Sequence, residues 1–373
     1  MSSGRPPSPP SSNDAQEGLD QLESLRGSER RVAMATLVST KGTTPKKEGA
    51  KMWVGEGGRI LGSVTIGGCV DARVLEAAEK VLAGAGSSLL SISMDDEEAW
   101  DIGFTCGGTV EVLVEQVALD GAVDPIVAAY DVIRQEIAAG RRAVAVAPLS
   151  GEGRRVVVRE DGSLVGSLGA ATLDSEAQGV ALDVMRRAAS RAGTLGDPGD
   201  AFFFELHGPA TTMVIYGAGV VAMPLVSIAK ALGWKAVIVD GRERYATRER
   251  FPQADEIHIG ILGEIAERLP CDASTVVVLV AHDYKFELPV LRTVLRRSPA
   301  YVGLLGSRKR GKAILDFLAE EGFDAETLSR IHVPVGLDLG AQTAGEIALA
   351  IAAEALAVTH RRSGGSLARG GAA

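Results

Sequence analysis

The chain has 373 residues, enough for two or three domains, and its composition (46% hydrophobic, 23% charged) is that of a globular protein. Its formal net charge of -9 argues against nonspecific nucleic-acid binding, and no segment reaches the roughly 18 apolar residues of a membrane span. Three widely spaced cysteines and a Ser- and Pro-rich N-terminus without a signal-peptide pattern fit a reducing cytoplasm. We therefore expect a cytoplasmic protein with neither a nucleic-acid nor a membrane partner.

Hydrophobic periodicity predicts a mixed α+β domain over residues 29–195, after a disordered tail over residues 1–28. A basic loop, residues 41–47, follows the first strand, and a glycine-rich turn predicts a hairpin next. The expected strands cover residues 31–38, 51–54, 59–64, 88–93, 109–117, 143–148 and 156–159, and the expected helices cover 70–82, 124–139 and 175–192.

The pattern changes after the Gly- and Pro-rich stretch 193–200, which is typical of a linker. Beyond it, apolar strands alternate with helices, which predicts a Rossmann-like, doubly wound parallel sheet over residues 196–360. Residues 361–373 are expected to form a flexible tail. We recognise no internal repeat in the sequence.

Cys69 follows Gly67 and Gly68 and precedes an amphipathic helix. A thiol at a helix N-terminus faces unpaired N–H groups, which favour the thiolate that binds metals. The alternative is a small buried residue in a tight turn. A second glycine-flanked cysteine, Cys106 before Gly107, favours the functional interpretation.

Gly217 and Gly219 begin a G-x-G-x-x-[G/A] pattern that ends at Ala222, directly after a strand and at the start of a helix. Asp240 closes the next strand, where it would accept a hydrogen bond from a ribose hydroxyl. The pattern predicts a phosphate-binding βαβ unit. In the alternative, the glycines serve only helix–strand packing.

Two further strand ends carry polar residues. Gly306 and Ser307 precede three cations, Arg308 to Arg310, which form either an anion site or a solvated surface. His282 and Asp283 fit either ligand contact and proton transfer or helix capping. Cys271 is expected to be a loop or core residue.

Taken together, the motifs resemble the XdhC/CoxI family of xanthine dehydrogenase accessory factors, including its CoxF-type members. The resemblance extends from about Arg31 to about Val358. The segments that carry it are 42–45 (Gly-Thr-Thr-Pro), 49–52 (Gly-Ala-Lys-Met), 67–69 (Gly-Gly-Cys), 106–108 (Cys-Gly-Gly) with Glu115, 217–219 (Gly-Ala-Gly), 303–308 (Gly-Leu-Leu-Gly-Ser-Arg), 332–338 (His-Val-Pro-Val-Gly-Leu-Asp), 346–347 (Glu-Ile) and 353–354 (Ala-Glu).

The resemblance implies an accessory protein that binds and protects molybdenum cofactor (molybdopterin), aids its sulfuration and delivers it to an apo molybdenum hydroxylase of the xanthine dehydrogenase, CO dehydrogenase or aldehyde oxidase type. A cysteine desulfurase is a further implied partner. Cys69 would contact the metal, with Cys106 as second choice. The anionic end of the cofactor would lie on Lys46 and Lys47, on the Gly217 turn, or on Ser307 and Arg308.

The chain departs from the family pattern at several of these positions. Val220 replaces a frequent His, Lys46 replaces an Arg, and Gly345 stands in place of a Pro. Around Cys69 the chain has two glycines and an aspartate where many members have three glycines and a glutamate, which is closer to the CoxF pattern.

Two other functions are compatible with the Gly217 fingerprint. One is an NAD(P)-dependent oxidoreductase with His282 as acid/base, although no Tyr-x-x-x-Lys pattern accompanies it. The other is a regulatory protein that binds a nucleotide without turnover. The apolar fraction also fits a homodimer, for which the sequence locates no interface.

Overall fold

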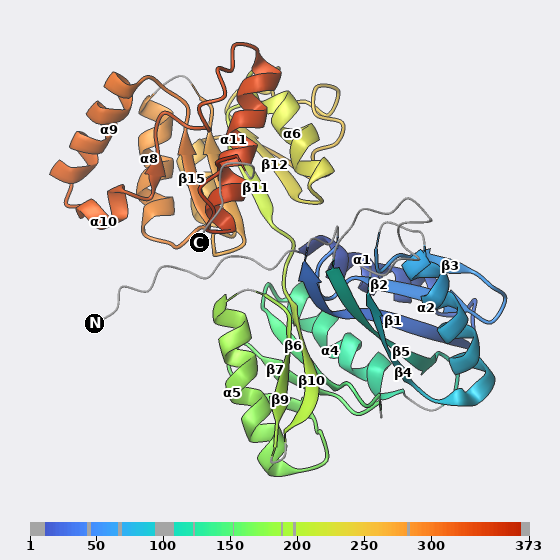
Figure 1. The fold of residues 1–373 in the computed structure, drawn as a ribbon. Coiled ribbons are helices and arrows are strands. Elements are labelled where there is room, and N and C mark those ends of the chain that lie inside the picture. Colours follow the sequence, from blue (N-terminus) through green and yellow to red (C-terminus); the bar gives the residue numbers. More distant parts are fainter. Residues whose placement is uncertain are drawn as a thin grey trace. The chain divides into compact units, whose positions relative to one another are not determined.

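The computed structural model describes residues 12–42, 46–65, 69–93, 108–121, 124–151, 153–187, 189–196, 199–281 and 284–366. The chain divides after Pro209 into an N-terminal and a C-terminal unit, each with its own hydrophobic core (Figure 1). The predicted boundary after residue 195 is therefore too early.

The N-terminal unit is built on two five-stranded antiparallel sheets, in the orders β3-β2-β1-β5-β4 and β8-β7-β6-β10-β9. The elements of its first half are α1 (Ser12–Leu25), β1 (Arg31–Gly42), β2 (Lys51–Gly55), β3 (Ile60–Gly62), α2 (Cys69–Lys80) with the π-helical turn η1 (Val81–Ala85), β4 (Ser88–Ser93) and β5 (Gly108–Ala118). Those of its second half are α4 (Pro125–Ala138), β6 (Ala143–Pro148), β7 (Val156–Arg159), β8 (Leu164–Gly166), α5 (Ala171–Arg187), β9 (Arg191–Leu195) and β10 (Asp200–His207).

Helix α1 corrects the prediction of a disordered tail over residues 1–28 from Ser12 on, and residues 1–11 lie outside the described residues. Leu19, Leu22 and Leu25 recur at helical spacing and are buried against β1 and β2. The Ser- and Pro-rich composition of the first residues obscured this short amphipathic stretch.

The predicted linker at 193–200 is also wrong, because it forms the β9–β10 hairpin. Glycine and proline are as typical of hairpin turns as of linkers. The apolar run after the turn decides between them, since Phe202 and Phe204 are buried in the second sheet. The same hairpin ends the predicted helix 175–192 early, at Arg187.

The two halves of the N-terminal unit repeat one topology, a helix, three strands, a helix and two strands, with the same strand order in each sheet. The prediction of no internal repeat is therefore corrected. When the strand registers of the two halves are aligned, Met52 is equivalent to Val156 and Gly62 is equivalent to Gly166. A Cβ at Gly62 or Gly166 would lie 2.4 Å from the carbonyl oxygen of Lys51 or Arg155, so both require glycine for the same reason. Few identical residues and unequal loops hide the repeat in the sequence.

Two buried ion pairs cross between the halves at equivalent positions. Lys51 Nζ lies 2.9 Å from Glu205 Oε1, and Arg155 Nη2 lies 2.5 Å from Glu115 Oε2. Lys51 begins β2 and Arg155 precedes β7, whereas the two glutamates occupy β5 and β10. All four side chains are at most 5% exposed. Each half therefore supplies the counter-charge for a carboxylate buried in the other half.

The environment of Glu205 favours its ionised form. Burial on its own would raise the pKa of this carboxyl, but the Lys51 ammonium, aided by the neighbouring His207 ring, holds it well below its ordinary value. The Tyr130 hydroxyl donates to Glu205 Oε2 at 2.9 Å, and burial raises the pKa of that tyrosine. The phenol stays protonated and is a fixed donor to the carboxylate.

The C-terminal unit is the predicted Rossmann-like sheet, with six parallel strands in the order β13-β12-β11-β14-β15-β16. Its elements are β11 (Thr212–Tyr216), α6 (Ala222–Ala231), β12 (Lys235–Asp240), β13 (Glu256–Ile259), α7 (Leu262–Arg268), β14 (Thr275–Leu279), α8 (Tyr284–Leu295), β15 (Tyr301–Leu304), α9 (Arg308–Glu320), α10 (Ala325–Leu328), β16 (Ile331–His332) and α11 (Ala344–Thr359).

Helices cover both faces of this parallel sheet. Met213 and Ile215 of β11 pack with α6 and α11 on one face, and Val214 and Tyr216 pack with α7, α8 and α9 on the other (Figure 1). The predicted doubly wound sheet is confirmed, because strands buried on both faces are the reason that apolar runs replace alternation in this part of the sequence.

Candidate functional site

The three motif segments of the first half emerge at one end of its sheet. Gly42, the last residue of β1, pairs with Gly108, the first residue of β5. Lys51 begins β2 opposite Thr36, six residues before Gly42 in β1, and Gly62 ends β3 opposite Met52, so these strand ends point in the same direction as Gly42. The described ends of β1, β2, β3 and β5 that adjoin the motif segments therefore all point toward the same edge of the sheet.

Several predicted site residues lie outside the described residues: Gly67, Gly68, Cys106 and Gly107. Cys69 is the first residue of α2, as the sequence predicts. Lys46 is partly buried in the loop between β1 and β2. The thiol contacts proposed for Cys69 and Cys106 stay predictions.

Asp71 holds Ser63 and Thr65, the described residues that lead toward α2. It was not among the predicted site residues. Its carboxylate accepts hydrogen bonds from Ser63 Oγ at 2.6 Å and from Thr65 Oγ1 at 3.0 Å. In the second half, Asp174 accepts from Ser167 Oγ at 2.6 Å and from the backbone N–H of Leu168 at 2.7 Å. Both halves thus use an aspartate in the first turn of the helix to hold the preceding loop.

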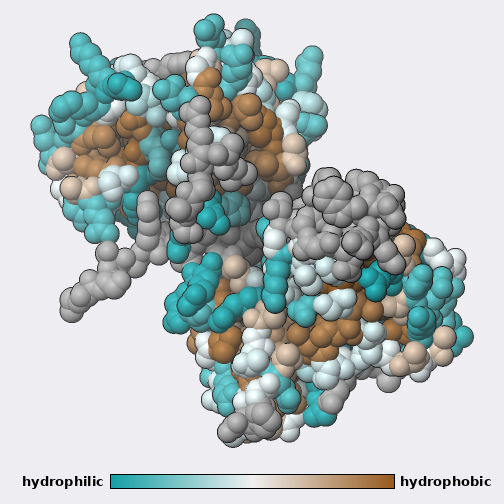
Figure 2. All heavy atoms as spheres, in the orientation of Figure 1, coloured by the Kyte–Doolittle hydropathy of each residue, from teal (hydrophilic) through white to brown (hydrophobic). Residues whose placement is uncertain are grey.

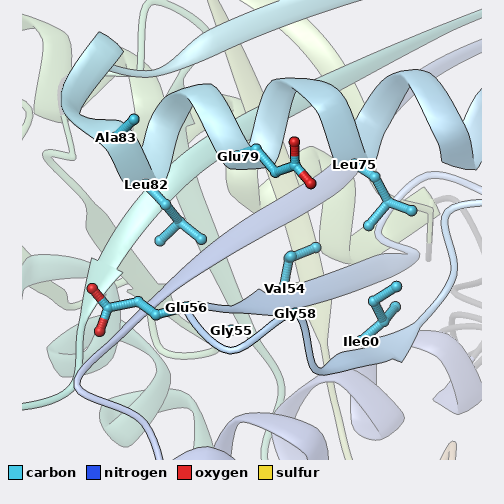
Figure 3. Close-up of a pocket in the computed structure, with 9 residues that line it drawn as sticks. All are labelled: Val54, Gly55, Glu56, Gly58, Ile60, Leu75, Glu79, Leu82 and Ala83. Carbon is cyan, nitrogen blue, oxygen red and sulfur yellow. The ribbon is translucent and has the colours of Figure 1, made fainter.

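A pocket of about 410 Å³ lies between α2 with η1 and the β2–β3 hairpin (Figure 3). Leu75 and Leu82 face Val54 and Ile60 across it, and two acidic side chains, Glu56 and Glu79, are also among its lining residues. The hairpin turn is at the end of β2 opposite Lys51, away from the motif segments. Its acidic lining disfavours a phosphate-bearing ligand.

In the C-terminal unit, Gly217 and Gly219 have different roles. Gly217 has φ +115°, and a Cβ there would lie 2.7 Å from the backbone nitrogen of Ala281. A Cβ at Gly219 would meet no atom within 4 Å. Helix α6 follows with no side chain capping its first turn. Gly217 is thus required for packing, whereas Gly219 borders open space beside uncapped N–H groups, the arrangement that suits a phosphate.

We expect Gly217→Ala to destabilise the C-terminal unit by about 1–3 kcal/mol, because alanine would be strained at this φ and would clash with Ala281. Gly219→Ala is the matched control and should change stability by less than about 0.5 kcal/mol. Hydrogen exchange of β11 and α6 peptides in the full chain measures both effects. Equal protection in the two variants would contradict the assignment of Gly217 to packing.

The Asp240 carboxylate is already fully engaged by protein donors. It accepts from the backbone N–H of Ala218 at 2.6 Å and from the backbone N–H, Nε and Nη2 of Arg242 at 2.9, 2.9 and 2.8 Å. Burial would raise its pKa, but these donors lower it. The contact between Asp240 and a ribose hydroxyl stays a prediction, and it would require one of these donors to be displaced.

The second predicted anion site, at Gly306 and Ser307, has fewer groups available for a ligand than the Gly217 turn. Ser307 caps α9 by accepting the N–H of Arg310, and the Arg310 guanidinium pairs with the buried Glu287 and donates to the carbonyl oxygen of Leu305. Arg308, the first residue of α9, is exposed. The structure therefore favours the Gly217 turn over Gly306 and Ser307 as a phosphate site.

The other residues that the sequence singled out are His282, Asp283 and Cys271. The first two lie outside the described residues. Cys271 is partly buried against the core, where burial raises the pKa of its thiol to about 12, so it stays protonated at neutral pH. Within the described ranges, no three His, Cys, Asp or Glu side chains gather as a metal site. Among the same residues, every helix is too short or too polar to cross a bilayer.

Comparison with known proteins agrees with this architecture. The model of the XdhC Rossmann domain matches residues 213–355, and that of the XdhC and CoxI family matches residues 25–93. The chain belongs to the XdhC and CoxI family. The first match runs from β11 into α11, and the second runs from the last residue of α1 to the end of β4, including Lys46 and Cys69.

Two curated relatives of this XdhC/CoxI protein match over most of its length. One, from Bacillus subtilis, is named as a probable xanthine dehydrogenase subunit, and it is 24% identical over 91% of this chain and 97% of its own. The molybdenum cofactor insertion chaperone PaoD of Escherichia coli is 27% identical over 87% of this chain and 82% of its own. A crystal structure described as a xanthine dehydrogenase from Bacillus halodurans shares the fold, with a TM-score of 0.73 at 24% identity, over 94% of this chain and 98% of that one.

Proposed function

We propose that this XdhC/CoxI protein binds molybdenum cofactor as cargo and delivers it to an apo molybdenum hydroxylase. The observation that carries the proposal is that the strand ends beside three motif segments, Gly42, Gly62 and Gly108, point toward the same edge of the first sheet, and that α2 begins with Cys69. The relative PaoD, a cofactor insertion chaperone by name, supports the choice of cargo.

The internal repeat supports the assignment of the cargo site to the first half of the N-terminal unit. The first two strands of each half are joined by stretches of similar length, residues 43–50 and 149–155. The last two strands are joined by residues 94–107 in the first half and by residues 196–199 in the second. The second half keeps the sheet and its aspartate-tied helix but lacks the long connection before the last strand and the cysteines. Extra loop length on a shared scaffold is typical of a ligand-binding half.

The chemistry of the cargo fits both ends of the proposed arrangement. A molybdenum dithiolene is soft, so a thiolate is a suitable contact, and Cys69 at the N-terminus of α2 is our first choice. The phosphate of the pterin requires N–H donors or cations, which Lys46 or the turn at Gly219 would supply. We propose no resident metal and no covalent step for the chain itself.

Reconstitution tests delivery directly. The chain purified with its cargo should restore activity to an apo molybdenum hydroxylase, and chain from a host that cannot make the cofactor should not. Activation by both preparations, or by neither, would contradict delivery by this protein.

The internal repeat also supplies a matched pair of variants. Asp71→Asn should lower cargo retention about tenfold, because it loosens the loop before Cys69, and Asp174→Asn should leave retention unchanged. Each should cost a similar stability of about 1 kcal/mol. Molybdenum retained after gel filtration measures the effect, and equal losses in both variants would show a general rather than a local role.

The oxidoreductase alternative is less well supported. Its main evidence is the Gly217 fingerprint, but the carboxylate at the end of β12 is bound by Ala218 and Arg242 instead of standing open to a ribose.

A further inference from the structure

A second cavity, of about 530 Å³, lies at the carboxyl end of the parallel sheet of the C-terminal unit. Its size falls within the ~300–1,000 Å³ range of small-molecule sites. The lining residues come from the ends of β12, β13 and β14 and from the starts of α7 and α8: Asp240, Gly241, Arg242, Gly260, Ile261, Leu262, Ala281 and Phe286. Ligands of open parallel sheets bind at this edge.

The walls of this cavity are apolar and open to a ligand. Ile261 is 63% exposed and Phe286 is 53% exposed, and both line the cavity. Figure 2 shows apolar residues at the surface of this unit, and Phe317 and Leu349 are exposed without lining the cavity, so exposure alone does not mark a site. What distinguishes Ile261 and Phe286 is that they line one cavity together with Gly241 and Gly260, the glycines that follow β12 and β13.

The polar group that this cavity presents is a guanidinium and not a free carboxylate. Both oxygens of Asp240 are saturated by Ala218 and Arg242. The Arg242 guanidinium lies 4.1 Å from the centre of the Tyr245 ring, and its Nη1 has no hydrogen-bond partner among the described residues. A planar cation beside apolar walls suits an electron-rich heterocycle or a negatively charged substituent.

The neighbouring turn supplies a place for a phosphate. Asp240 Oδ2 holds the backbone N–H of Ala218, so the end of β12 is tied directly to the glycine turn. One residue further, Gly219 borders open space at the uncapped start of α6. Apolar walls, a guanidinium and a phosphate-binding turn are therefore joined through one hydrogen bond.

We propose that this cavity binds the planar nitrogen heterocycle of a phosphate ester, with Ile261 and Phe286 against the ring and Arg242 rather than Asp240 facing the ligand. The proposal deepens the proposed function. Two compounds could supply this heterocycle and phosphate, and for the first of them the proposal rests on the proposed function. These compounds are a pterin phosphate, as in the cargo, and a nucleotide.

Titration of the full-length protein tests the proposal with two probes, the fluorescent oxidised pterin phosphate obtained from molybdopterin and NADP. At least one of the two probes should bind saturably, with a Kd below about 1 mM. Ile261→Asp and Phe286→Ala should weaken that binding tenfold or more. Phe317→Ala, an exposed ring on α9 that does not line the cavity, is the control and should bind within twofold of the wild-type protein.

The outcomes separate this proposal from the function proposed above. Binding of NADP alone, lost in both cavity variants, would support the cavity as a nucleotide site and place the cargo elsewhere. Cargo that is retained in the cavity variants but lost in Cys69→Ala would support delivery and show that the cavity does not bind the cargo. The cavity proposal would then stand only if the cavity variants lose NADP binding, and it would otherwise be overturned. Saturable binding of neither probe, or binding that Ile261→Asp and Phe286→Ala leave unchanged, would overturn the cavity proposal.

Discussion

Lys51→Met is expected to destabilise the N-terminal unit by about 3–5 kcal/mol, because it leaves Glu205 as a buried charge without its ammonium partner. The remaining neighbours, the Tyr130 hydroxyl and the His207 ring, do not replace a full positive charge. Urea unfolding in a Trp234→Phe background measures this loss, since the remaining tryptophans, 53 and 100, both lie in the N-terminal unit.

The effect should depend on pH in a defined direction. With Lys51 removed, burial dominates and the folded-state pKa of Glu205 rises above its unfolded value. A raised carboxyl pKa costs stability as the pH rises through it, so the deficit should be largest at pH 7 and shrink as the pH falls toward 5. Lys51→Met/Glu205→Gln should recover at least half of the loss.

An exposed ion pair in the same unit is the control. Arg31 pairs with Glu56, and the two side chains are 44% and 35% exposed, so Arg31→Met should cost at most about 1 kcal/mol. Arg155→Met, at the position equivalent to Lys51, should be as damaging as Lys51→Met because it isolates Glu115. Losses below 1 kcal/mol in both Lys51→Met and Arg155→Met would contradict the crossed ion pairs.

Cys69→Ala is expected to lower the affinity for molybdenum cofactor at least about tenfold while leaving the fold intact. Serine at this position should not rescue binding, because a hydroxyl is a hard ligand and the dithiolene-bound metal is soft. Cys271→Ala is the matched control, since that thiol is partly buried in the core and protonated. Equilibrium titration of the cofactor into the three variants measures the difference, and a Cys69→Ala variant with wild-type affinity would rule out the thiol contact.

Much of the fold was predictable because the signals are local. Strands such as β4, β6 and β7 match their predicted bounds, since each is a short apolar or alternating run between turn residues. The parallel sheet followed from buried apolar strands that alternate with helices.

The misses have a common physical cause, which is that they depend on partners distant in the sequence. The β9–β10 hairpin is recognisable only once Phe202 and Phe204 have a sheet to pack in. The internal repeat lies in the strand order and in charge pairs about 150 and 40 residues apart, Lys51 with Glu205 and Arg155 with Glu115.

The site was predictable in part for the same reason. The family motifs contain both candidate ligand-binding residues and residues that stabilise the fold, and the sequence does not separate the two. Lys51 and Glu115 belong to motif segments but are buried counter-charges, and Glu354 accepts from the Tyr301 hydroxyl and the backbone N–H of Gly336. Arg242 was missed because the fingerprint directs attention to Asp240, although a basic residue two positions after that aspartate was visible in the sequence.

The most direct test of the central claim is the molybdenum and pterin content of the protein as it leaves the cell. Purified anaerobically from a host that makes the cofactor, the chain should carry molybdenum and pterin in equal molar amounts, approaching about one of each per chain, and Cys69→Ala should carry neither. Wild-type protein that is free of both, although it is folded and the host makes the cofactor, would contradict a role as carrier.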